Sequence, residues 1–160
     1  MTGRLYVSVC GSGDAKPEVT ALAEEVGSRL AAANAVVVCG GLGGVMEAVC
    51  KGAKSAGGTT VGILPGTERS DANDFVDVGL PTGLGESRNA LIARAADAVI
   101  AIRGEFGTLS EVGLALKIGK PVVGLDTWEL HRNGEVVDAI KPVATPAEAV
   151  DLALRLARAT

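Results

Sequence analysis

The sequence has 160 residues, of which 48% are hydrophobic and only 2% are aromatic. This length and apolar content suit a single domain, residues 1–160, and they exclude a disordered chain. The 15 Lys and Arg against 19 Asp and Glu give a formal net charge of −4. Because there is no basic stripe and there are few aromatic side chains for stacking on bases, we expect no general nucleic-acid binding.

The sequence predicts no targeting segment and no membrane span. Residues Met1–Cys10 hold no long apolar region, and no apolar run approaches the roughly 20 residues that cross a bilayer. We therefore expect a soluble, cytoplasmic protein with no membrane partner.

The three cysteines have no spacing typical of a metal site. Cys10, Cys39 and Cys50 form no Cys-x-x-Cys pair, so we expect buried free thiols and no metal. Cys10 and Cys39 each end an apolar run just before a glycine, which suggests that they are neighbours on adjacent strands.

Short apolar runs alternate with helical patterns along the chain. The runs expected to be strands are Leu5–Val9, Val36–Cys39, Thr60–Leu64, Ala98–Ile102, Val122–Leu125 and Ile140–Val143, with a faint candidate at Phe75–Val78. Apolar residues at helical spacing predict helices over Pro17–Leu30, Val45–Ala53 and Thr108–Lys117, with a closing helix from Pro146. A further helix is expected to start at Glu86–Asn89, with Leu91, Ile92, Ala95 and Ala96 on its apolar face. This alternation predicts a three-layer α/β fold with a mostly parallel sheet, in which ligands bind at the carboxyl ends of the strands.

Two glycine turns follow predicted strands and open predicted helices. Gly40–Gly44 follows one strand, and Gly104–Glu111 follows another. Gly104 and Gly107 let the backbone turn sharply, so that unpaired N–H groups at the start of the helix face one anion. The second turn therefore predicts a phosphate-sized site.

Thr108 and Glu111 have two open interpretations. Thr-x-x-Glu is the spacing of a capping box, in which about 1 kcal/mol of helix stability already explains both residues. In the other interpretation, both side chains contact a ligand. For Thr145 and Glu148, where Pro146 follows the threonine, the capping box is a sufficient explanation.

Arg88 follows a long, weakly structured segment, Pro65–Glu86, and such loops usually have a function. It lies on the same helical side as Leu91 and Ile92, so we expect it to point inward. A buried arginine either pairs with a structural carboxylate or binds an anion, and the long loop favours the anion. Arg94 lacks this setting and is expected to face solvent.

The helix over Thr108–Lys117 is apolar on two sides, with only Ser110 and Lys117 as a polar strip. Its second side packs either on another copy of the chain, which would form a symmetric homodimer, or on the loop that carries Trp128. Glu111 lies on this second side. The loop Asp126–Gly134, which ends in an Asn-Gly turn, contains His131, for which we identify no partner and no role.

Five motifs, in this order, resemble the LONELY GUY (LOG) family, formerly labelled lysine decarboxylase-like, over about residues 4–126. The motifs are Gly40-Gly41-Leu42-Gly43-Gly44-Val45-Met46-Glu47, Gly62-Ile63-Leu64-Pro65-Gly66, Arg88-Asn89, Gly107-Thr108-Leu109-Ser110-Glu111 and Gly119-Lys120-Pro121-Val122. The stretch Thr82–Asn89 is more similar to the bacterial branch related to molybdenum-cofactor carrier proteins.

The resemblance implies a Rossmann-like homodimer that binds a nucleoside 5′-monophosphate and, in enzymatic members, cleaves the base from ribose 5-phosphate. It makes Arg88 and Glu111 the catalytic pair and implies no cofactor. The residues expected to contact the phosphorylated ligand lie at the strand ends and glycine turns: Gly11, Ser12, Gly40, Gly41, Gly43, Gly44, Met46, Thr82, Asn89, Gly104, Gly107 and Thr108.

This chain departs from the motif of enzymatic members, Pro-Gly-Gly-x-Gly-Thr-x-x-Glu. Arg103 replaces the proline and Glu105 replaces a glycine, while Asn89 replaces the lysine of the usual Arg-Lys pair. A carboxylate about 5 Å from a phosphate costs on the order of 3 kcal/mol per unit charge at an effective dielectric near 20, so either Arg103 offsets it or Glu105 turns outward. The sequence thus leaves open whether the ligand is hydrolysed or is only carried, as a nucleotide or a phosphorylated pterin such as molybdenum cofactor.

Overall fold

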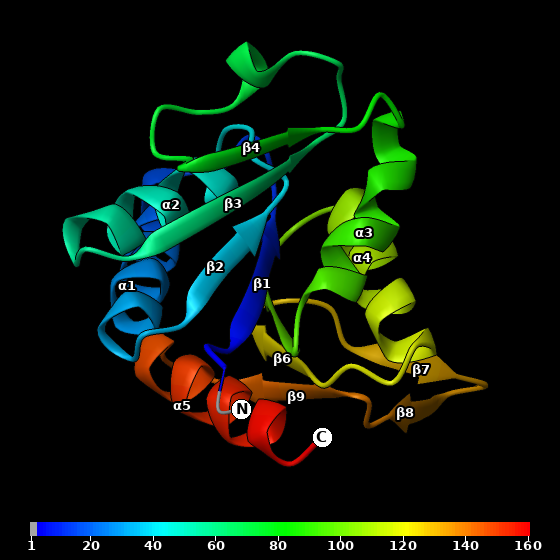
Figure 1. Ribbon diagram of the computed structural model, residues 1–160. Coiled ribbons are helices and arrows are strands. Elements are labelled where there is room, and N and C mark those ends of the chain that lie inside the picture. Colours follow the sequence, from blue (N-terminus) through cyan, green and yellow to red (C-terminus); the bar gives the residue numbers. More distant parts are fainter. Residues whose placement is uncertain (1–2) are drawn as a thin grey trace.

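A computed structural model describes residues 3–160 and shows a three-layer α/β fold (Figure 1). Its central sheet has seven strands in the order β4-β3-β2-β1-β5-β6-β9, and every neighbouring pair is parallel. The strands are β1 (Tyr6–Gly11), β2 (Val36–Cys39), β3 (Thr59–Leu64), β4 (Val78–Pro81), β5 (Ala98–Ile102), β6 (Val122–Leu125) and β9 (Ile140–Val143). The predicted fold class is confirmed.

Helices cover both faces of the sheet (Figure 1). On one face lie α1 (Pro17–Ala32), α2 (Val45–Ser55) and α5 (Pro146–Arg158), and on the other lie α3 (Asn89–Ala95) and α4 (Phe106–Lys117). Two short 3-10 helices, η1 (Arg69–Asp71) and η2 (Gly85–Arg88), belong to the segment between β3 and α3. The strand order reverses between β1 and β5, and in such sheets the ligand crevice forms at this point.

The core is built from aliphatic side chains, as the composition predicts. The strands β2 and β5 are buried along their whole length because helices cover both of their faces. No helix of residues 3–160 combines the length and the apolar character that a membrane crossing requires.

Two local predictions were wrong. The fourth strand is Val78–Pro81 and not Phe75–Val78, because Asp77 at its start accepts hydrogen bonds from the Thr60 amide and hydroxyl and so fixes the alignment with β3. The predicted loop Asp126–Gly134 contains part of a hairpin.

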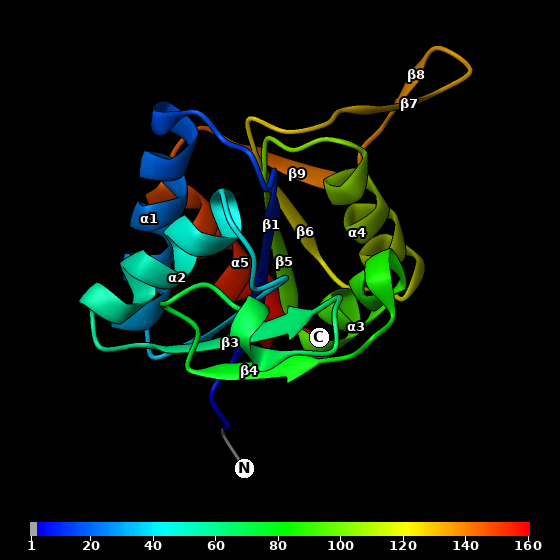
Figure 2. The ribbon, with the colours of Figure 1, turned by 90° about the horizontal axis from the view of Figure 1, so that it is seen from above.

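The hairpin pairs β7 (Leu130–Arg132) with β8 (Glu135–Val137) and projects from the body of the molecule (Figure 2). Its turn is the predicted Asn-Gly pair, with φ of 53° at Asn133 and 83° at Gly134. The strands have three residues each, too few for an alternating pattern to be recognised in sequence. His131 does have a partner, since its Nε2 lies 2.6 Å from Glu129 Oε1.

The thiols are free and buried, as predicted, but their neighbours differ from the prediction. Cys10 and Cys39 lie on opposite faces of the sheet, in different core clusters. The Sγ atom of Cys39 instead lies 3.5 Å from Cys50 Sγ, on α2. The predicted cap of α5 is confirmed, because the Glu148 amide donates to Thr145 Oγ1 (3.2 Å) and the Ala144 amide donates to Glu148 Oε2 (2.9 Å).

Candidate functional site

A cavity of about 220 Å³ opens at the carboxyl ends of β1 and β5. Its walls come from the turn after β1, the start of α2, the segment η2–α3 and the first turns of α4. The lining residues are Gly11, Ser12, Gly13, Met46, Glu86, Arg88, Asn89, Glu105, Gly107, Thr108 and Glu111. The glycine turn before α4 and the predicted Arg88 and Glu111 therefore meet in one place.

The helix α4 offers unused backbone donors to this cavity. It begins at Phe106, two residues before the predicted start, after a turn in which Arg103 and Gly104 have φ of 45° and 93°. Within residues 3–160 the amides of 106–108 have no acceptor, and the side chain of the N-cap residue Glu105 makes no capping hydrogen bond. These N–H groups and the positive end of the helix dipole form a suitable site for an anion.

The capping-box interpretation of Thr108 and Glu111 was wrong. Thr108 is the third residue of the helix and is 3% exposed, and Glu111 lies a full turn inside the helix. Gly104 packs directly over Thr108, where a Cβ atom would overlap the threonine side chain. The glycine is thus required for the turn that leads into α4.

Arg88 points inward, as predicted, and is 8% exposed. Its guanidinium donates from Nε to the Ile63 carbonyl (2.9 Å), from Nη2 to the Gly40 carbonyl (3.4 Å) and from Nη1 to Asn89 Oδ1. No carboxylate of residues 3–160 forms an ion pair with it. The alternative of a structural ion pair was therefore wrong, and neutral oxygens hold a buried cation at the cavity wall.

The electrostatics of Arg88 reflect this burial. Burial lowers the pKa of Arg88, and the negative charges of Glu111 and Glu86 act in the opposite direction. A guanidinium held by carbonyls at the wall of a cavity keeps its charge available to an anion.

Glu111 is a buried carboxyl group at the same cavity. It is 8% exposed, and burial raises its pKa to about 7, with Arg88 and a contact from the Cys10 thiol acting in the opposite direction. Burial likewise raises the pKa of Cys10, and the charge of Glu111 adds to this effect, so the thiol stays protonated. A carboxyl group with a pKa near neutrality is suited to proton transfer.

A short chain of hydrogen bonds joins α3 to α4 beside the cavity. Asn89 Nδ2 donates to Ser110 Oγ (3.0 Å), and Ser110 Oγ donates to the Gly107 carbonyl (2.7 Å). Because Asn89 also accepts from Arg88, this chain fixes the guanidinium relative to the first turn of α4.

The predicted residues fall into two groups. Those at the cavity wall are Gly11, Ser12, Met46, Arg88, Asn89, Gly107, Thr108 and Glu111. Those that lie outside the wall are Gly40, Gly41, Gly43, Gly44, Thr82 and Gly104, and their contact with a ligand stays a prediction.

Some residues outside the wall have structural roles. Gly40 accepts from Arg88, Gly44 caps α2 with φ of 63°, and Thr82 donates to the Leu64 carbonyl (2.7 Å). Each of these contacts fixes a segment that borders the cavity.

Sequence reasoning missed Gly13 and Glu86 as wall residues. Gly13 directly follows the predicted contacts Gly11 and Ser12, and Glu86 lies inside the recognised stretch Thr82–Asn89, so this adjacency was the available signal. Glu105 was recognised only as a departure from the family motif, and it is exposed at the wall.

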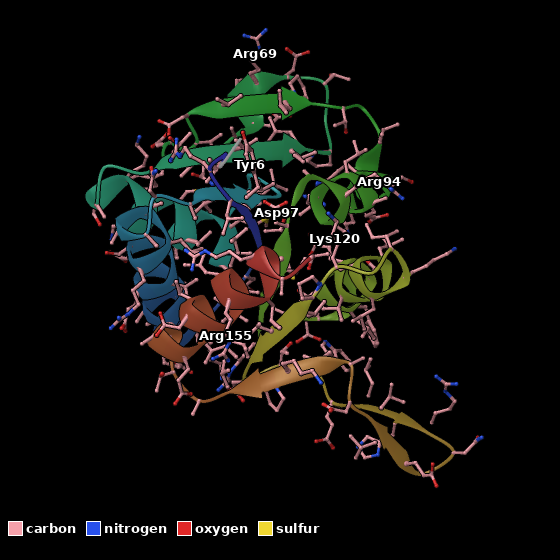
Figure 3. All side chains as sticks on the ribbon, turned by 60° about the horizontal axis from the view of Figure 1, so that its bottom comes forward. Tyr6, Arg69, Arg94, Asp97, Lys120 and Arg155 are labelled. Carbon is pink, nitrogen blue, oxygen red and sulfur yellow. The ribbon has the colours of Figure 1, made fainter. Side chains whose placement is uncertain are left out.

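Arg103 does not offset the charge of Glu105, because it forms an ion pair with Asp126 (Nε–Oδ2, 2.7 Å). Arg94 faces solvent from α3, as predicted (Figure 3).

The chain matches the model of the SLOG cluster4 family over residues 4–150. It belongs to the SLOG cluster4 family. This SLOG protein is 40% identical over 147 residues, 92% of this chain and 93% of the other, to an uncharacterized protein of Archaeoglobus fulgidus. It is 34% identical over 139 residues, 80% of this chain and 74% of the other, to the cytokinin riboside 5′-monophosphate phosphoribohydrolase of Mycobacterium tuberculosis.

The SLOG protein is similar in structure to solved molybdenum cofactor proteins. The molybdenum cofactor binding protein of Rippkaea orientalis superposes with a TM-score of 0.89 at 33% identity, over 98% of this chain and 99% of the other. The molybdenum cofactor carrier protein of Chlamydomonas reinhardtii gives a TM-score of 0.85 at 33% identity, over 99% and 100% of the chains. The predicted resemblance to a LOG-like family related to such carriers is confirmed.

Proposed function

We propose that this SLOG protein binds a nucleoside 5′-monophosphate or a similar phosphorylated small molecule in the cavity between η2 and α4. The main supporting observation is that the free amides of Gly107 and Thr108, at the start of α4, share one cavity with a buried guanidinium and a buried carboxyl group. Phosphate oxygens accept from these amides, and Arg88 supplies the countercharge.

The size of the cavity supports a sugar phosphate within it. Its volume of about 220 Å³ is below the roughly 300–1,000 Å³ of sites that enclose drug-sized ligands. A ribose 5-phosphate portion fits this scale, and the base or pterin then lies toward the exposed carboxylate of Glu86.

Hydrolysis of the N-glycosidic bond is the first form of this function. Glu111, with a pKa of about 7, is present in both protonation states near neutral pH. As a carboxylate it steadies the positive charge that develops on the sugar or positions a water molecule, and Arg88 orients the phosphorylated sugar. The similarity to phosphoribohydrolases supports this form.

Carriage of a phosphorylated pterin without turnover is the second form. Glu105, exposed at the wall and without an ion-pair partner in residues 3–160, makes the phosphate end less favourable for a dianion than a glycine would. The similarity to molybdenum cofactor carriers over nearly the whole chain supports this form.

Binding and turnover are measured separately. Isothermal titration calorimetry with ribose 5-phosphate and AMP tests binding, and chromatography of free base after incubation with AMP, GMP, CMP and UMP tests hydrolysis. Arg88→Met is expected to weaken ribose 5-phosphate binding at least tenfold. Glu111→Gln is expected to abolish base release, whereas the exposed Glu47→Gln, on α2, serves as the control.

The results of these two assays distinguish a hydrolase from a carrier. Base release that disappears in Glu111→Gln supports the hydrolase, and tight binding without release supports the carrier. If ribose 5-phosphate and all four nucleotides fail to bind the wild-type protein, the proposal is wrong.

We also propose that the protein is a homodimer that pairs through α4. Trp128 and Leu130 from the loop after β6 do pack on the cluster beneath this helix, as one alternative predicts, yet Leu114, Leu116 and Ile118 stay only partly buried. A second copy would cover them. Light scattering that gives a monomer mass at micromolar concentration would contradict the dimer.

A further inference from the structure

The cavity contains three carboxyl groups and few donors for them. Glu86 and Glu105 are exposed, whereas Glu111 is 8% exposed. Within residues 3–160 no N–H or O–H group donates to any of these carboxylates, and the Cys10 thiol beside Glu111 is the neighbouring donor. Ionised carboxylates only accept hydrogen bonds. A ligand that displaces water from these carboxylates must therefore supply donors of its own.

The two exposed carboxylates stand on different walls. Glu105 directly precedes the free amides of α4, so it lies at the phosphate end of the cavity. Glu86 belongs to η2, and its charge acts on Arg88 without forming an ion pair with it. Glu86 is thus the exposed carboxylate that faces the remainder of a ligand whose phosphate occupies the α4 amides.

We propose that Glu86 determines the specificity of the site by accepting two hydrogen bonds from a 2-amino-4-oxopyrimidine edge, the arrangement that guanine and pterins share. This inference rests on the proposed function, because the phosphate at α4 sets which end of the ligand reaches η2. The proposed function specifies only a phosphorylated ligand, and this inference also specifies the type of ring that the ligand carries.

The chemistry of the ring edges explains the choice. Guanine and pterins present a ring N–H and an exocyclic NH₂ side by side, and a carboxylate accepts both in a paired arrangement. Adenine presents one donor and one ring lone pair, which repels a carboxylate oxygen. Hypoxanthine keeps the ring N–H but lacks the amino group, so it makes one of the two bonds.

The test compares four phosphorylated probes by calorimetry: GMP, IMP, AMP and neopterin monophosphate, with ribose 5-phosphate as the ring-free reference. We expect GMP, neopterin monophosphate or both to bind the wild-type protein at least tenfold more tightly than AMP, with IMP between them. Whichever of GMP and neopterin monophosphate binds more tightly shows whether the site takes a guanine or a pterin ring.

Glu86→Gln changes the pattern of donors at the wall without changing its shape. Glutamine offers one acceptor and one donor, so it matches the edge of adenine but accepts only one of the two adjacent N–H donors of guanine. We expect the variant to lose at least tenfold in GMP affinity, to keep or gain AMP affinity, and to bind ribose 5-phosphate as the wild type does. Because Glu86 is exposed, the fold should tolerate the change, and the melting temperature checks this.

Glu105→Gln is the matched control at the phosphate end. Loss of its charge should strengthen the binding of ribose 5-phosphate, GMP and AMP by the same factor and leave the GMP-to-AMP ratio unchanged. If the wild type binds GMP, neopterin monophosphate, IMP and AMP within threefold of one another, or if Glu86→Gln leaves the affinity of the preferred probe relative to AMP unchanged, this inference is overturned while the proposed function stands. If ribose 5-phosphate also fails to bind, both are overturned.

Discussion

Replacing Glu111 by glutamine should make the protein more stable at alkaline pH. Glu111 is 8% exposed, and burial raises its pKa from 4.5 to about 7. In this pH window the folded state binds more protons than the unfolded state, so the stability of the wild type falls as the pH rises through it. Glutamine has nearly the same shape and does not titrate, so the variant lacks this loss.

The magnitude follows from the two pKa values. With 4.5 in the unfolded chain and 7 in the folded protein, the linkage relation gives a loss of about 2 kcal/mol between pH 5.5 and pH 8. The free energy of unfolding of Glu111→Gln, minus that of the wild type, should therefore increase by about this amount over the same range. Above pH 8 the difference levels off, because Glu111 is then ionised in both states.

Urea denaturation followed by circular dichroism, at pH 5.5, 6.5, 7.3 and 8, measures this difference. Glu105→Gln is the matched control: it lines the same cavity but is exposed, so its difference from the wild type should stay nearly flat. If the difference for Glu111→Gln also stays flat, burial does not raise the pKa of Glu111, and its proposed role in hydrolysis is not supported.

Two further substitutions test the local structure. Gly44→Ala should destabilise the protein by about 2 kcal/mol or more and lower Tm by about 4–8 °C. The reason is that φ is 63° at Gly44 and a Cβ atom would overlap the Ser12 carbonyl oxygen. Gly43→Ala, at a negative φ, should lose less than half as much stability, and equal losses for the two variants would contradict this explanation. Thr145→Ala should remove about 1 kcal/mol and about 2–4 °C of Tm through loss of the cap that the Glu148 amide uses; an unchanged melting curve would show that this cap contributes little.

The sequence was sufficient for the fold because the fold depends on local patterns. Apolar runs of four to six residues that alternate with amphipathic helices have few solutions other than a parallel sheet between two helical layers. The inward direction of Arg88 also followed from helical spacing alone. So did the cap at Thr145, since capping involves residues close together in the chain.

The sequence was insufficient where two distant segments decide the outcome. Thr108 and Glu111 have the same spacing as Thr145 and Glu148, yet α4 begins at Phe106 because the turn at Arg103 and Gly104 sets its start. The partner of Cys39 depends on which face of β2 meets α2.

The composition of the cavity is likewise a product of the tertiary structure. Glu86 and Glu105 are 19 positions apart in sequence, and the packing of α3 against α4 and the approach of η2 bring them into one cavity with Arg88. The sequence by itself determined the layers, the glycine turns and the inward arginine. Only the tertiary structure decided which carboxylates share their cavity, because burial and charge at a site depend on groups that the chain order does not place together.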